Sequence, residues 1–107
     1  MLSSENSELL SAKKLLTVVY DSGMDERVTE TLEEIGVAGW TKVFGAHGVG
    51  GTGRKENTSI WPGTINMLYL VLESSDVERV AAALRALQAS YRRNPGMTLW
   101  AQPAELL

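Results

Sequence analysis

Residues 64–73 read TINMLYLVLE and form the most strongly β-forming segment of this 107-residue chain. Apolar, aromatic and β-branched side chains follow one another there without proline or glycine, which is typical of a β-strand. Upstream, residues 40–46 (WTKVFGA) have a similar character, with Val43 and Phe44 at their centre. We expect these two segments to pair as antiparallel strands of one sheet.

The residues before this pair predict one more strand and one helix. Residues 15–20 (LLTVVY) form a short β-rich run that ends at the turn-forming triplet DSG. In residues 25–36 apolar residues then recur at helical spacing, which predicts a helix. This helix starts with two acidic residues and ends at Gly36. The apolar residues that set this spacing are Val28, Leu32 and Ile35.

The residues after the pair predict a second helix and a last strand. Ser75 and Glu78 match a capping box at a helix start. One apolar helical face then continues to about residue 92 and consists of Val77, Val80, Ala81, Leu84, Leu87 and Tyr91. The triplet NPG at 94–96 breaks the helix, and residues 97–101 (MTLWA) supply a strand that ends before Pro103.

The resulting order, βαββαβ, predicts an α+β fold of the ferredoxin-like class. Two helices should cover one face of an antiparallel sheet, with a long loop between strands two and three. The other face then exposes apolar side chains, and oligomerisation is the simplest way to cover them. The alternative is a monomer with a mixed surface. The residues that we expect on this face are Val43, Leu68, Leu70 and Trp100.

The composition limits the domain organisation and the chemistry. We expect one domain over residues 13–107 and a flexible N-terminal tail over residues 1–12, which lacks the basic start and apolar core of a signal peptide. Without cysteine, disulfides and thiolate metal sites are excluded. The net charge of −3 argues against nucleic-acid binding, and no membrane insertion is expected. The sequence thus predicts a cytoplasmic protein.

The loop over residues 45–63 (GAHGVGGTGRKENTSIWPG) is far longer than a hairpin needs and holds six glycines. Dinucleotide and P-loop templates match parts of it, but both require a helix where a strand follows here. Glycine N–H groups can still converge on an anion beside two basic side chains. The anion-binding residues predicted in this loop are Gly48, Gly50, Gly51, Gly53, Arg54 and Lys55.

Other residues of the loop have two interpretations each. His47 and Glu56 are the only visible metal ligands, although a lone histidine in such a loop is commonly just polar. Ile60 and Trp61 are either the packed start of the next strand or an exposed anchor for a protein partner.

No nucleophile–base arrangement or carboxylate pair is visible, so we expect a protein that is not an enzyme. An RNA-recognition domain shares the element order but needs aromatic and basic motifs that are missing here.

Three segments of this chain resemble the nitrogen-regulatory P-II superfamily. They are residues 39–43 (GWTKV), 51–58 (GTGRKENT) and 60–63 (IWPG), similar to the stretch G-x-G-R-x-x-x-x-T-x-x-Y-R-G-A-E-Y at the base of the family's mobile T-loop. The resemblance covers about residues 13–107. It implies a homotrimer that binds adenine nucleotides in the clefts between subunits and controls enzymes or transporters through the T-loop.

The resemblance also implies roles for residues outside the loop. Thr41 matches a position that contacts the nucleotide base, and Arg92 and Arg93 stand where a phosphate could be met across the subunit interface. The chain departs from the family pattern at Asn66, which falls where the modifiable tyrosine would sit, and at Met97, where a lysine is expected.

Our leading hypothesis is a trimeric signalling protein that binds a small anionic ligand, such as ATP, ADP or another nucleotide, and thereby changes the order of residues 45–63. The expected protein partner is an enzyme or a transporter. An alternative is a metal-responsive or metal-tolerance trimer, or an adaptor of a metal-efflux system. An α+β barrel enzyme is a third.

Overall fold

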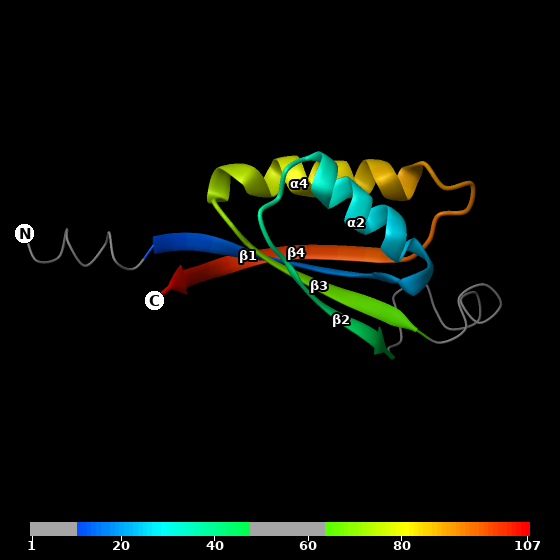
Figure 1. The fold of residues 1–107 in the computed structure, drawn as a ribbon, viewed down its shortest axis with the longest axis horizontal. Helices are drawn as coiled ribbons and strands as arrows, with labels where there is room; N and C mark the ends of the chain where they lie inside the picture. Colours follow the sequence, from blue (N-terminus) through cyan, green and yellow to red (C-terminus); the bar gives the residue numbers. More distant parts are fainter. Residues whose placement is uncertain (1–10, 48–63) are drawn as a thin grey trace, which may run out of the picture.

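The computed structural model describes residues 11–47 and 64–107 (Figure 1). The elements follow one another as β1 (Ser11–Asp21), a short 3-10 helix η1 (Ser22–Met24), α2 (Asp25–Glu34), β2 (Thr41–Ala46), β3 (Ile65–Leu72), α4 (Ser74–Ala89) and β4 (Met97–Leu106). This order confirms the predicted α+β, ferredoxin-like βαββαβ arrangement. Among the described residues, no helix has both the length and the apolar character needed to cross a membrane.

The four strands form one sheet in the order β2-β3-β1-β4, and each neighbouring pair is antiparallel. The predicted pairing of β2 with β3 is confirmed, with Thr41 opposite Tyr69 and Val43 opposite Met67. Both α2 and α4 lie on the same side of this sheet (Figure 1). The sheet therefore has one face covered by these helices and one face that neither of them covers.

The core lies between the sheet and the two helices. Alternate residues of β1 and β3 point to the helical side, because successive side chains of a strand point to opposite faces. The buried core residues from the strands are Leu16, Val18, Tyr20, Leu68, Leu70 and Leu72. Those from the helical side are Met24, Val28, Leu32, Val80, Leu84 and Leu87, so the predicted helical periods are largely confirmed.

The uncovered face differs in part from the prediction. Val43 and Trp100 are both 45% exposed, as expected, but Leu68 and Leu70 are almost fully buried in the core. The expectation for the two leucines was wrong, because their side chains point to the same face of the sheet as the strand residues that pack against the helices. We call the uncovered side the open sheet face. The register places on it Thr41, Val43, Met67, Tyr69, Val71, Leu15, Thr17, Val19, Thr98 and Trp100.

Both strands next to the chain ends are longer than the sequence predicts. β1 begins at Ser11 rather than at residue 15, so residues 11–12 of the expected tail belong to the sheet; residues 1–10 lie outside the described part. β4 continues through Pro103, which lies opposite Lys14, to Leu106. Proline is tolerated there because β4 is an edge strand, and its outer side needs no backbone donor.

Helix α4 begins without the predicted capping box and ends earlier than predicted. Its N-cap is Glu73, with no side-chain cap, and Ser75 already lies inside the first turn. The Glu73 carboxylate instead pairs with Lys13 of β1. The helix ends at Ala89, before residue 92, and the hydroxyl of Ser90 donates to the carbonyl oxygen of Leu87 at 2.6 Å.

Candidate functional site

Four strand ends meet at one end of the sheet, on the right in Figure 1. In the β1–β3 register Asp21 lies opposite Ile65, and in the β1–β4 register Tyr20 lies opposite Met97. Ala46 at the end of β2 also lies opposite Ile65. The connection between β2 and β3 and the connection between α4 and β4 therefore both join the sheet at this end.

Backbone and side-chain hydrogen bonds fasten the two connections to the end of β1. The N–H of Asp21 donates to the carbonyl oxygen of Gly96 at 3.1 Å, and the N–H of Gly96 donates to Asp21 Oδ2 at 2.7 Å. The hydroxyls of Ser22 and Thr64 lie 2.6 Å apart. Two adjacent residues, Asp21 at the end of β1 and Ser22 directly after it, thus hold the residues that directly precede β4 and β3, which are Gly96 and Thr64.

Asp21 offers a test of this attachment. Burial raises the pKa of the Asp21 carboxyl, and the hydrogen bond from Gly96 offsets this only in part. A raised pKa in the folded state means that ionisation of Asp21 opposes folding above that pKa, and that the penalty disappears below the unfolded-state pKa of about 3.9. We expect Asp21→Asn, which keeps an acceptor, to be at least as stable as wild type at pH 7, with a difference that shrinks as the pH falls.

Urea unfolding of Asp21→Asn and wild type between pH 7 and pH 3.5 measures this difference. The control is Asp21→Ala, which leaves the Gly96 N–H without its acceptor and should lose about 1 kcal/mol. Equal destabilisation by both substitutions at pH 7 would contradict the assignment.

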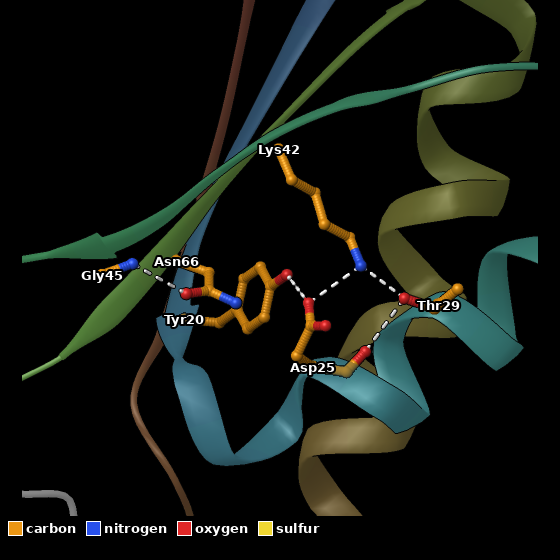
Figure 2. Close-up of polar contacts among 6 residues, drawn as sticks. All are labelled: Tyr20, Asp25, Thr29, Lys42, Gly45 and Asn66. Carbon is orange, nitrogen blue, oxygen red and sulfur yellow. Dashed lines mark hydrogen bonds and ion pairs between the residues drawn. The ribbon is translucent and has the colours of Figure 1, made fainter.

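A partly buried polar network lies beside this end of the sheet and joins β2 to α2 (Figure 2). Lys42 Nζ donates to Asp25 Oδ1 at 2.8 Å and to the hydroxyl of Thr29. The hydroxyl of Tyr20 donates to the same oxygen of Asp25 at 2.6 Å. Asn66 also belongs to this group, which we call the Lys42 network, because its side chain lowers the pKa of both Tyr20 and Asp25. Its Oδ1 accepts the N–H of Gly45 at 3.3 Å.

The electrostatics of the Lys42 network are those of a satisfied ion pair. Burial would raise the pKa of Asp25, but hydrogen bonds from Lys42 and Tyr20 outweigh it and lower the pKa overall. Burial and the bond to Asp25 raise the pKa of Tyr20, which stays a protonated donor. In the described part of the chain, every buried side-chain nitrogen or oxygen has a hydrogen-bond partner. The network is built to hold elements together rather than to react.

The described residues among the predicted ligand contacts lie in two separate parts of the fold. Thr41 is exposed on the open sheet face at the start of β2. Arg92 and Arg93 are exposed in the connection before β4, which Gln88 holds by donating to the carbonyl oxygen of Pro95 at 2.7 Å. Because β2 and β4 are the opposite edges of the sheet, one subunit does not bring Thr41 and the arginines into one site.

Most of the other predicted site residues lie outside the described part of the chain. His47 is exposed directly after β2, and residues 11–47 and 64–107 contain no cluster of three or more metal-binding side chains. The predicted residues that lie outside the described part of the chain are Gly48, Gly50, Gly51, Gly53, Arg54, Lys55, Glu56, Ile60 and Trp61.

The sequence analysis missed the Lys42 network. Asn66 is a buried residue of β3 that contacts Gly45, whereas the resemblance places it at a modifiable position. One signal was available: Lys42 is the charged residue of the β-rich segment WTKVFGA, and Asn66 is the amide residue of the β-rich segment INMLYLVL. Polar residues in such segments either face solvent or require partners, and Asp25 was already placed at the start of a helix.

Comparisons with known proteins agree with this architecture. A family model described as nitrogen regulatory protein P-II matches residues 13–104. A search of curated proteins finds no match. CPII, a nitrogen regulatory PII-like protein from Thiomonas intermedia K12 bound to ADP, AMP and bicarbonate, has a similar structure, with a TM-score of 0.72 and 16% sequence identity over 91% of this chain and 94% of that chain.

Two further solved structures share the fold. One is a putative PII-like signaling protein from Thermus thermophilus, with a TM-score of 0.65 and 23% identity over 92% of each chain. The other is a DUF3240 family protein from Shewanella baltica OS155, with a TM-score of 0.66 and 14% identity over 88% of this chain and 91% of that chain.

Proposed function

Because the chain belongs to the nitrogen regulatory protein P-II family, we propose that it is a cytoplasmic homotrimeric signal-transduction protein. It binds a small anionic ligand, an adenine nucleotide such as ATP or ADP, in the cleft between subunits. Residues 45–63 then act as its T-loop and control a partner enzyme or transporter. The protein regulates other molecules and catalyses no reaction of its own.

Thr41 lies on the edge strand β2, whereas Arg92 and Arg93 lie in the connection that leads into the opposite edge strand, β4. This separation is the observation that carries the proposal. A ring of subunits brings the β2 edge of one copy toward the β4 edge of the next, so that a site divided between edges becomes complete only in the oligomer. An adenine nucleotide suits such a site, because its base can lie against the exposed strand while its phosphates meet guanidinium groups. The adenine nucleotides bound to CPII support this choice of ligand.

The open sheet face supports the trimer. Thr17 lies in the middle of this face and is only 2% exposed, because Tyr69 and Trp100 flank it on the neighbouring strands. Val43, Val71 and Trp100 are each about half exposed and apolar. A second copy that covers this face removes their apolar surface from water.

Calorimetric titration of the apo protein with ATP, ADP, AMP, cyclic AMP and divalent metals tests the ligand. We expect saturable binding of an adenine nucleotide with one site per subunit interface. Binding of a divalent metal without binding of any nucleotide at millimolar concentration would favour the metal-responsive alternative.

Two arginines provide the corresponding mutational test. A charge-assisted hydrogen bond to phosphate contributes about 1.5–3 kcal/mol, so Arg54→Ala or Arg93→Ala should weaken nucleotide binding by about one to two decades. Arg85→Ala, which removes an exposed arginine from α4, is the matched control and should leave the affinity unchanged. Wild-type affinity in both Arg54→Ala and Arg93→Ala would show that the phosphates bind elsewhere.

A further inference from the structure

Strand β2 is held in place by very little apolar packing. Thr41, Val43, Phe44 and Gly45 are exposed, and only Lys42 and Ala46 are half-buried. As an edge strand, β2 has a hydrogen-bonded neighbour on one side only. Burial of an apolar face normally fixes the register of a strand, because a slip by one residue moves every side chain to the other face. In an isolated subunit, β2 buries no such apolar face.

Lys42 supplies the missing anchor on the helical side. Its side chain is only 9% exposed and reaches α2, where it binds the Asp25 carboxylate and the Thr29 hydroxyl (Figure 2). A slip of β2 by one residue would carry Lys42 to the open sheet face and leave the Asp25 carboxylate without its cation. The ion pair therefore penalises the wrong register strongly.

Asn66 anchors the other end of β2. Val43 lies opposite Met67 and Ala46 lies opposite Ile65, so β2 contains one more residue than β3 between these pairs, which is a β-bulge. Gly45 lies in this bulge with φ +72°, a conformation that favours glycine. Its N–H donates to the side chain of Asn66, which is 2% exposed and directly opposite Tyr20 on β1. The bulge is thus tied to one fixed position along β3.

We propose that Lys42 and Asn66 specify the register of β2 and are therefore positioning residues for Thr41 in the ligand site. Thr41 precedes Lys42, so holding Lys42 against α2 turns Thr41 to the open sheet face, opposite Tyr69. This inference rests on the proposed function for the role of Thr41. The register itself is independent of any ligand.

Lys42→Met tests the proposal, since methionine keeps much of the side-chain length without the charge. We expect ADP affinity to fall by about tenfold, as for the loss of one good contact. In nuclear magnetic resonance spectra the cross-strand contacts between Val43 and Met67 should weaken or be joined by contacts of a second register. Lys42→Arg, which can still reach Asp25, should restore both the affinity and the single register. Asn66→Leu should disturb the register near Gly45 in the same way.

Lys13→Met is the matched control. Lys13 also forms an ion pair with a carboxylate, that of Glu73, and its side chain is 18% exposed. Loss of this ion pair should lower stability without changing ADP affinity or the Val43–Met67 contacts. If Lys42→Met does not fold, Thr29→Val, which removes one of the two Lys42 partners, should give a smaller effect of the same kind.

Two results separate this inference from the proposed function. If wild type binds no nucleotide, the proposed function fails, and the spectra alone decide the register. A single native register in Lys42→Met and in Asn66→Leu, or wild-type ADP affinity in both, overturns the inference.

Discussion

Trp100→Asp is expected to convert the proposed trimer into a folded monomer. Trp100 lies on the open sheet face, opposite Thr17, and its side chain is outside the core formed with the helices. An aspartate there would be an unpaired charge in the interface of each subunit, and burying such a charge costs several kcal/mol. The folded monomer should survive because no core contact is lost. Sedimentation velocity measures the mass, and circular dichroism measures the fold.

Ala82→Asp is the control for the added charge. Ala82 is an exposed residue of α4. Helix α4 lies on the side of the sheet opposite the open sheet face (Figure 1). This variant should sediment as the wild type does. A wild type that sediments as a monomer of 11.7 kDa at micromolar concentration would refute the trimer, and with it a ligand site divided between subunits.

Leu68→Ala should lower stability by about 2–5 kcal/mol, the usual cost of truncating a leucine that is fully buried. Leu68 lies on the central strand β3 and is 0% exposed beneath the helices. The loss combines the transfer energy of the removed atoms with the cavity that remains, since the rigid sheet cannot collapse around it. Thermal and urea unfolding, compared at equal protein concentration, measure this effect.

Leu106→Ala is the same substitution at a residue that is 46% exposed near the end of β4. We expect it to change stability by about 0.5 kcal/mol or less, as is usual at exposed positions. Similar losses for the two variants would contradict the placement of Leu68 in the core. The Trp100 and Leu68 variants together thus test both faces of one sheet.

The order of the elements could be predicted from the sequence because each element has a local signal. The period of the apolar residues changes between strands and helices, and DSG, Gly36 and NPG mark the boundaries. Gly36 indeed adopts φ +81° at the end of α2. Family membership could be predicted for a related reason, since the motifs around the long loop are continuous in sequence.

Boundaries that depend on neighbouring strands could not be predicted in this way. Pro103 argued for the end of β4, but its position at the sheet edge makes the missing donor harmless. The capping box at Ser75 and Glu78 failed because Glu73 became the N-cap and its side chain pairs with a distant lysine on β1. Both outcomes depend on which strand lies beside which.

The sequence by itself determined the fold class and the family, because these follow from periodicity and from local motifs. Only the tertiary structure decided which face each strand buries, because a shift of one residue along a strand moves a side chain to the opposite face of the sheet. Leu68 lies in the core, whereas Val43 lies on the open sheet face. The tertiary structure alone also brought Asp25, Lys42 and Asn66 together from a helix and two strands. A polar residue in a β-rich segment signals only that a partner is needed; the partners themselves meet only after the sheet and helix have packed.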